Sequence, residues 1–113
     1  MPKAKTASLD RVFAALSDPT RRQLVSRLHE HEATISELAG DFDMSFQAVS
    51  KHLKVLDNAG LLTRKREGKF FRCGYNPQPL NEALRWISFH HDFWKGSFDS
   101  LDAFLTETDP DQS

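Results

Sequence analysis

The sequence has a single cysteine, Cys73, and no apolar run long enough to span a membrane. One cysteine excludes an internal disulfide and suits a reducing compartment, so we expect a cytoplasmic protein. A membrane-spanning helix needs about 18 or more apolar residues in a row, so we expect no membrane partner. The N-terminal segment is short and polar, unlike a signal peptide. The net charge is only −1, which by itself gives no argument for a polyanionic partner.

The charges are nevertheless distributed unevenly along the 113 residues, a length that suits one domain. Residues 51 to 72 hold seven lysines and arginines against two acids, whereas residues 74 to 113 hold two against seven. This asymmetry predicts a basic end that suits a polyanion and an acidic end that does not.

Residues 34 to 60 predict two short helices joined by a tight turn. Thr34 followed by Glu37 matches a capping box, and Ser45 is a good N-cap for the second helix. Gly60 favours a left-handed residue that ends this helix. Apolar residues recur at helical spacing in both segments. They are Ile35, Leu38, Ala39 and Phe42 in the first helix, and Val49, Leu53 and Leu56 in the second.

Two strands should follow, over residues 61 to 67 and 70 to 76. Gly68 and Lys69 between them suit a two-residue hairpin turn. We expect Phe71, Cys73 and Tyr75 to face the core, and Arg64, Arg66, Lys69 and Arg72 to face outward, with Lys65 near the tip. Two helices and a basic hairpin in this order are typical of a winged helix-turn-helix. The predicted fold is therefore mainly α, with about five helices and a small β-hairpin.

The outer side of the second helix carries residues that can read double-stranded DNA. A helix fits the major groove, where Gln can bond adenine and Lys can reach guanine. The expected base contacts are Phe46, Gln47, Ser50 and Lys51, and the expected backbone contacts are Lys54, Arg64, Lys65, Arg66, Lys69 and Arg72. Phe46 has a second reading, in which it folds back onto Phe42 as core. His52 is expected to be packed or half-exposed.

The residues before this segment predict two more helices. Residues 1 to 7 read as a flexible tail, and Ser8 can cap a helix over residues 9 to 16. Asp18 and Pro19 are suited to the N-cap and first position of the next helix. Arg21 and Arg22 lie in its first turn, which is unfavourable for cations. We expect either an ion pair with a nearby acid or a DNA phosphate to offset this.

Residues 80 to 106 predict one long helix with two apolar stripes. The first stripe follows a heptad spacing and predicts a homodimer interface: Leu84, Ile87, His91, Trp94, Phe98, Leu101 and Leu105. The second stripe consists of Trp86, Phe89, Phe93 and Phe104. A helix that is apolar on two sides needs a partner beyond its own small domain. We place the domain at residues 8 to 106 and expect residues 107 to 113 to form a flexible acidic tail.

The segments DPTRRQLVSRL and TISELAGDFDMSFQAVSKHLKVLDNAGLL, followed by the basic hairpin, resemble the ArsR family of bacterial transcriptional repressors. The closing segment, with Trp86, Phe93 and Trp94, is similar to a branch that lacks the family's metal site. The resemblance covers residues 8 to 106. It implies a homodimer that binds an imperfect palindrome and represses transcription.

Sensing of a metal or an oxidant has little support in the residues. The arsenic and cadmium sensors of the family carry a Cys-x-Cys pair where this chain has Leu38 to Asp41. The last helix offers a zinc-type set of histidines and carboxylates, so a metal-responsive repressor that uses His90, His91 and carboxylates of that helix is an alternative. We expect no metal and no cofactor. Cys73 lacks a second cysteine and is expected to be a buried, inert thiol.

Two further function classes fit the sequence less well. An enzyme is not expected, because the adjacent His90, His91 and Asp92 point about 100° apart on a helix and cannot converge on a substrate. The other alternative is a protein-interaction module whose docking surface is the aromatic last helix. The basic patch on helix and hairpin favours DNA over this alternative. The sequence does not identify an effector.

Overall fold

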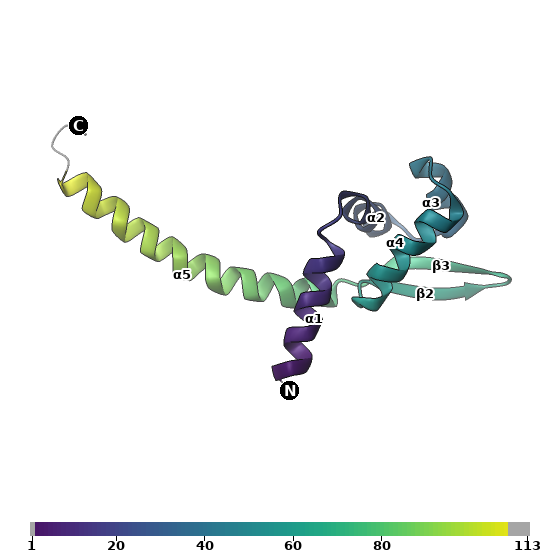
Figure 1. Cartoon of the computed structure of the whole chain (residues 1–113), viewed down its shortest axis with the longest axis horizontal. Coiled ribbons are helices and arrows are strands. Elements are labelled where there is room, and N and C mark those ends of the chain that lie inside the picture. The colour runs from purple at the N-terminus through teal and green to yellow at the C-terminus, as the bar shows by residue number, and fades with distance from the viewer. Residues whose placement is uncertain (1, 109–113) are drawn as a thin grey trace. The chain divides into compact units, whose positions relative to one another are not determined.

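The computed structural model describes the backbone of residues 2–108 and the side chains of residues 8–105 except Trp94, Phe98 and Ala103. In these residues the order of elements is α1, α2, β1, α3, α4, β2, β3, α5 (Figure 1). The chain divides into two units, one up to Glu82 and one from Ala83 onward. The first unit contains the helix-turn-helix and the hairpin, and the mainly helical winged fold is confirmed.

α1 runs Pro2–Ala15 and α2 runs Pro19–Glu30. The prediction that α1 starts at residue 9 after a Ser8 cap is wrong. Proline is tolerated in the first turn of a helix because the N–H it lacks would have no partner there. α2 begins as predicted, with Pro19 in its first turn and the Asp18 carboxylate accepting a hydrogen bond from the Arg21 backbone N–H at 3.0 Å.

α3 runs Ile35–Phe42 and α4 runs Phe46–Asn58, as the capping residues predicted. The hydroxyl of Thr34 accepts a hydrogen bond from the Glu37 backbone N–H at 3.2 Å and donates to the Glu37 carboxylate at 3.1 Å. Ser45 accepts from the Ala48 N–H at 3.1 Å. Asp43 adopts the left-handed conformation between the helices, with φ 52°. The turn therefore fixes the direction in which α4 leaves α3.

The sheet has three strands, one more than predicted. β1 is Ala33–Thr34, β2 is Leu62–Glu67 and β3 is Phe70–Tyr75, all antiparallel in the order β1-β3-β2. Gly68 at the predicted turn has φ 64°, a conformation that favours glycine. The hairpin of β2 and β3 is the wing.

The facing of the wing side chains was predicted wrongly. Arg64 pairs with Cys73, and Arg66 pairs with Phe71. Residues directly opposite each other in an antiparallel pair point to the same side of the sheet. The two arginines therefore share a face with Cys73 and Phe71, whereas Lys65 and its partner Arg72 lie on the other face. Cys73 is 4% exposed, as expected, but Phe71 is 48% exposed and is not a core residue.

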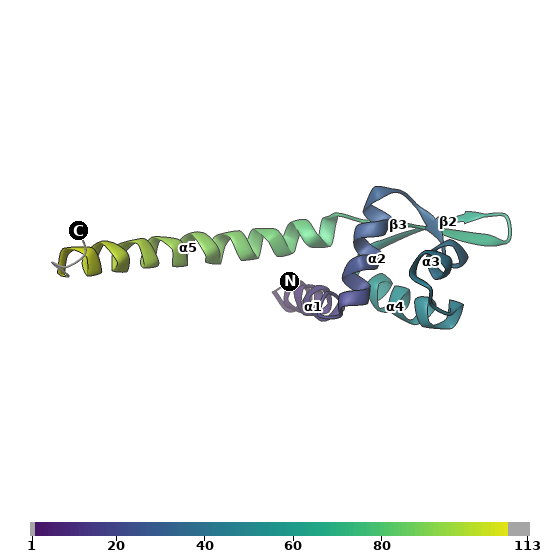
Figure 2. The ribbon, with the colours of Figure 1, turned by 90° about the horizontal axis from the view of Figure 1, so that it is seen from above.

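The core of the first unit lies where α2 and α3 meet β3 and where α4 meets α2, α3 and β2, and α1 packs on α4 (Figure 2). Val49, Leu53 and Leu56 form the buried side of α4, as predicted. α4 is therefore held from behind, with its opposite side open to solvent. The largest fully buried side chains are Leu24, Leu38, Leu56, Leu61, Val12 and Val49.

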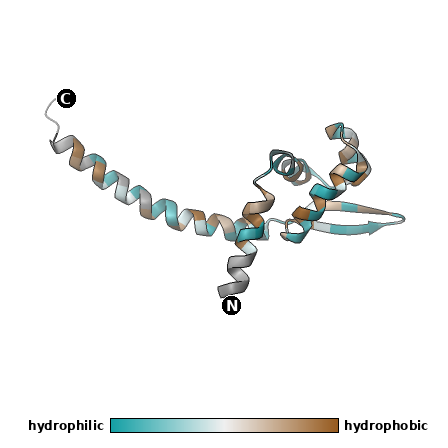
Figure 3. Cartoon of the chain, viewed as in Figure 1, coloured by the Kyte–Doolittle hydropathy of each residue, from teal (hydrophilic) through white to brown (hydrophobic). Residues whose placement is uncertain are grey.

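α5 runs Gln78–Thr108, a single helix of 31 residues. It ends two residues beyond the predicted boundary at residue 106. Hydrophobic and hydrophilic residues alternate along its length (Figure 3). Leu84, Ile87, Leu101 and Leu105 of the predicted dimer stripe are exposed, while the side chains of Trp94 and Phe98 lie outside those described. Within the part of the chain that the structure describes, no helix is long and apolar enough to span a membrane.

Candidate nucleic-acid interface

The open side of α4 presents the side chains predicted to read bases. Gln47 and Lys51 are exposed, and Ser50 is partly exposed. Phe46, the first residue of α4, is 50% exposed, which rules out the reading in which it is buried as core. Lys54 is exposed one turn further along the helix. The start of α4 can therefore approach a large ligand without any rearrangement of the core.

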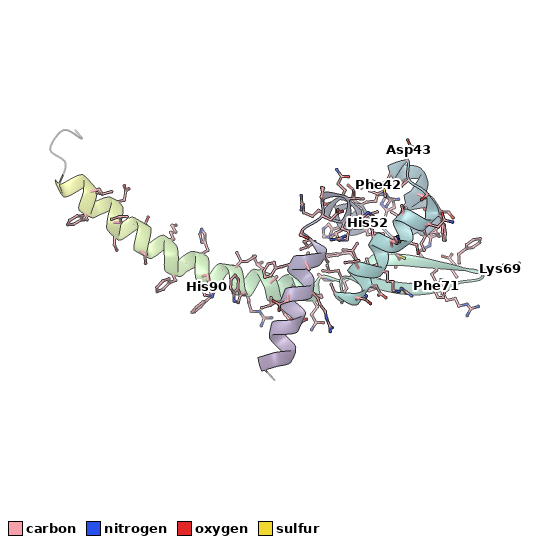
Figure 4. All side chains as sticks on the ribbon, viewed as in Figure 1. Phe42, Asp43, His52, Lys69, Phe71 and His90 are labelled. Atoms are coloured by element: carbon pink, nitrogen blue, oxygen red, sulfur yellow. The ribbon has the colours of Figure 1, made fainter. Side chains whose placement is uncertain are left out.

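The wing cations differ in how far they are already neutralised. The guanidinium of Arg64 lies 2.8 Å from the carboxylate of Asp57 on α4. Arg66 donates to the carbonyl of Gly68 at 3.3 Å, and its guanidinium carbon lies 6.0 Å from the centre of the Phe71 ring. Lys69 is exposed at the wing tip (Figure 4). The charge of the wing is therefore most available near its tip.

Arg72 is the wing residue held most firmly by acids. Its Nε donates to the Glu67 carboxylate at 2.7 Å, and its Nη2 lies 3.6 Å from that of Glu37. The hydrogen bond from Arg72 lowers the pKa of Glu67, and the same bond raises the pKa of Arg72. In contrast, none of the carboxylates described lies within ion-pair distance of Lys51, Lys54, Lys65 or Lys69. Among the described side chains of α4 and the wing, these four lysines carry positive charge that no carboxylate neutralises at ion-pair distance.

Arg21 and Arg22 make hydrogen bonds to backbone carbonyls that the sequence did not predict. Arg21 donates through Nε to the carbonyl of Ala15 at 2.6 Å and through Nη2 to that of Ala14 at 3.1 Å. Arg22 donates to the carbonyl of Leu16 at 2.7 Å. Both cations thus cap the C-terminal end of α1, where the helix dipole favours positive charge. After the hydrogen bond from its backbone N–H, the charge of Arg21 also helps to lower the pKa of the Asp18 carboxylate, so a nearby acid contributes as expected.

A polar cluster also ties α4 to the corner between α1 and α2. His52 lies on α4 (Figure 4). Its Nδ1 lies 3.5 Å from Nη1 of Arg21 and 3.8 Å from the carboxylate of Asp18. The pKa of Asp18 is lowered, chiefly by the hydrogen bond from the Arg21 backbone N–H. His52 is half-buried, as expected, but its role as a tie was missed. Arg21 and His52 are 31 positions apart in the sequence, and no local pattern links them.

The residues considered for sensing do not assemble a site within the described part of one chain. His90 packs against the rings of Trp86 and Phe89, at 4.4 Å and 5.2 Å between centroids. His91 lies 3.5 Å from the carboxylate of Asp92. No three His, Cys, Asp or Glu side chains among those described are grouped to hold a metal ion. Burial raises the pKa of the Cys73 thiol, which lowers its reactivity.

A helix held from behind by a core, beside a hairpin with available lysines, defines a winged helix-turn-helix protein of the DNA-binding class. Comparison with known proteins identifies the family. Residues 18–64 match the family described as "Bacterial regulatory protein, arsR family". The transcriptional regulator YuzN of Bacillus subtilis, itself uncharacterised, is 42% identical over 86 residues, which cover 69% of this chain and 94% of YuzN.

Two further relatives agree. The transcriptional repressor SdpR of Bacillus subtilis is 32% identical over 79 residues, which cover 70% of this chain and 88% of SdpR. An ArsR-like transcriptional regulator from Rhodococcus sp. RHA1 has a solved structure with a TM-score of 0.76, at 30% identity over 89% of this chain and 95% of that one. The chain belongs to the arsR family of bacterial regulatory proteins. It is a DNA-binding transcriptional regulator and not an enzyme.

Proposed function

We propose that this regulator is a homodimeric repressor that binds a palindromic operator in the cytoplasm. The observation that carries the proposal is the open side of α4, where Gln47 and Lys51 stand free of the core and of carboxylate partners. One such helix reads only a few base pairs, and a two-fold dimer reads two half-sites about one helical turn or a multiple apart. Repression is the activity that its relative SdpR carries in its name.

α5 supports the dimer. Leu84 and Ile87 are 59% and 45% exposed, and both belong to the heptad stripe predicted from the sequence. Large apolar side chains that recur along one helix mark an interface. We assign the interface to Leu84, Ile87, His91, Trp94, Phe98, Leu101 and Leu105, through which the two copies of α5 pair antiparallel.

The DNA contacts follow from the available charge. Phe46, Gln47, Ser50 and Lys51 contact bases, and Lys54 with the wing residues Arg64, Lys65, Arg66 and Lys69 contacts the backbone. Arg72 contributes less charge than the sequence suggested, because two carboxylates already hold it. Phosphate contacts release counterions, so the affinity should fall steeply with salt.

We assign the chain to the branch of the family without a thiolate metal site. The segment Leu38 to Asp41 in α3 contains no cysteine, and the one cysteine of the chain is buried in β3. Release from DNA would then follow a signal other than a metal bound by thiolates. Addition of zinc or cadmium should leave operator affinity unchanged.

The test compares two variants on two duplexes. Gln47→Ala should cost about 1–3 kcal/mol on the operator and little on random DNA, because it removes a base contact. Lys69→Ala should weaken both duplexes similarly and reduce the salt slope by about one, because it removes a phosphate contact. Lys95→Ala on α5 is the matched lysine control and should change neither.

The wild-type protein is measured first, on its own upstream DNA and on a random duplex at two salt concentrations. Tight binding to one palindromic site, with a complex of dimer mass, supports the proposal. Equal losses for Gln47→Ala on specific and random DNA would make the base-contact assignment wrong. If the wild type bound no duplex at low salt, the proposed function itself would fail.

A further inference from the structure

Three exposed phenylalanines gather between the start of α4 and the wing tip. Phe46 begins α4, and Phe70 and Phe71 begin β3. Phe46 and Phe71 are about half exposed and Phe70 is 63% exposed. All three line one shallow hollow, together with Lys69 and the first residues of α3. We call these three side chains the phenylalanine patch.

The patch is an unusual use of three large apolar residues in a small domain. Burying a phenylalanine fully stabilises a fold by roughly 1.5–3 kcal/mol, and here about half or more of the surface of each phenylalanine remains exposed. Exposed apolar side chains from separate elements that line one hollow are typical of a binding surface rather than of scattered surface residues. The fold therefore leaves the patch available to a ligand.

The charges around the hollow indicate what kind of ligand fits. Lys69 lines the hollow, and the guanidinium of Arg66 lies over the ring of Phe71. Among the side chains that the structure describes, those lining the hollow include no acid, whereas the neighbouring groove between α4 and β2 includes Asp57. An occupant must therefore be negatively charged and also present apolar surface. An apolar protein helix lacks the first property, and a free phosphate lacks the second.

The position of the patch selects DNA. Phe46 precedes Gln47 at the end of α4 proposed to enter the major groove, and Phe70 follows Lys69 at the tip of the wing. A ligand that bridges the recognition helix and the wing must pass between these two ends. In a duplex, the part between neighbouring grooves is one sugar–phosphate strand, with deoxyribose rings and, at the groove edge, thymine methyl groups as its apolar surface.

We propose that the phenylalanine patch packs against this DNA strand, with Phe70 and Phe71 on deoxyribose and Phe46 on a thymine methyl group. The inference rests on the proposed function. It adds apolar contact as a second source of DNA-binding energy beside the charge contacts. Lysine contacts weaken as salt rises, because they act through counterion release. Apolar contacts release no counterions, so the patch supplies a part of the affinity that salt does not remove.

The test measures operator affinity against salt for the wild-type chain and its variants. Phe70→Ala and Phe71→Ala should each weaken binding roughly tenfold, because a half-exposed ring gains only part of its full burial. The slope of log affinity against log salt should stay that of the wild type. Val55→Ala, an exposed apolar residue of α4 outside the hollow, is the control and should bind like the wild type.

Two results would overturn the inference. The first is unchanged affinity in both phenylalanine variants while the wild type binds its operator. The second is a loss with a reduced salt slope, which would mean that the rings only hold Lys69 in place. Either result leaves the proposed function intact, because the wild type still binds. Thermal melting of each variant should match that of the wild type, since the replaced rings are exposed.

The contact of Phe46 with thymine can be tested by changing the DNA rather than the protein. Replacing thymine by uracil removes only the methyl group. At one position in each half-site this replacement should weaken wild-type binding several-fold, and the Phe46→Ala variant should lose nothing further there. If every uracil substitution affects wild type and variant equally, Phe46 does not contact a thymine methyl group.

Discussion

α4 and α5 are both amphipathic helices of one small chain, but their apolar side chains differ in how far they are buried. Leu56 of α4 is fully buried, as is Val49, and the solvent side of α4 is mainly polar. Leu84 of α5 is 59% exposed, and both apolar stripes of α5 remain open wherever their side chains are described. The apolar side of α4 is buried by other elements of the same unit. By contrast, α5 carries large apolar side chains that the structure describes as exposed, Leu84 and Ile87 among them.

The difference separates two sources of specificity. The first unit fixes α4 through burial and through the polar cluster of Asp18, Arg21 and His52, so the geometry of one recognition helix is set within one chain. The spacing between two recognition helices cannot be set in this way. On our proposal α5 sets it, by pairing with a second copy.

The largest effect is expected from breaking the α5 interface. Ile87→Asp should abolish dimerisation, because a carboxylate in an apolar helix pair must lose its hydration without gaining a partner. Operator affinity should fall about a hundredfold or more, since two linked half-site contacts become two separate ones. Analytical ultracentrifugation gives the mass, and fluorescence anisotropy gives the affinity.

Ser88→Asp is the matched control for this prediction. Ser88 neighbours Ile87 on α5, is exposed, and belongs to neither apolar stripe. It should leave both mass and affinity unchanged. If Ile87→Asp remained a dimer with full affinity, the division of roles between α4 and α5 would be wrong.

Much of the structure of the first unit could be predicted from sequence, because local rules govern its helix caps and turns. The caps at Asp18, Thr34 and Ser45 and the turns at Gly60 and Gly68 depend on side chains within a few positions of each backbone group. The structure confirms all of them. The buried side of α4 was also predicted, because its period of 3.6 is visible in one helix.

What could not be predicted depends on residues distant in the sequence, with one exception. β1 has only two residues, too few to show a period, and it exists because β3 offers an edge. The tie between Arg21 and His52 likewise needs the packing of α1 on α4. The exception is the facing of Phe71: a two-residue turn at Gly68 already fixes Arg66 opposite Phe71, so that error was avoidable.

A second prediction applies the same substitution to both helices. Leu56→Ala should lower the free energy of unfolding by about 2–5 kcal/mol at every protein concentration, because it opens a cavity in the core of one chain. Leu84→Ala should have an effect that grows with protein concentration, because its lost contacts are between chains. Urea denaturation at several protein concentrations distinguishes the two. Concentration-independent effects for both variants would contradict the proposed role of α5.

A third prediction tests how firmly the first unit holds α4. Arg21→Ala should lower the free energy of unfolding by roughly 1–2 kcal/mol, because it removes two carbonyl hydrogen bonds and the approach to His52. Arg22→Ala removes one carbonyl bond and should cost about 1 kcal/mol or less. Arg21→Ala should also weaken operator binding, and Arg22→Ala should not. Equal affinities for the two variants would show that the contact with His52 does not position α4.

The smallest effect is expected at Cys73, which tests whether the first unit behaves as a closed core. Burial is the main cause of its raised pKa, opposed by the nearby Arg64 and reinforced by Asp57. A thiol whose pKa is higher in the folded than in the unfolded state stabilises the fold below the unfolded pKa, near 9.0, and this stabilisation is lost as pH rises through the folded pKa.

At neutral pH the Cys73 thiol should therefore remain protonated and react slowly, because the thiolate is the reactive form. Labelling by a disulfide reagent should be slow in the native protein and become fast in urea. Mild peroxide should leave operator affinity within about twofold, since an effect smaller than 0.4 kcal/mol is expected at a site that contacts no DNA. Fast native labelling with loss of DNA binding would mean that β3 opens readily. The wing would then be a sensing element, and the contrast between a closed first unit and an open α5 would no longer hold.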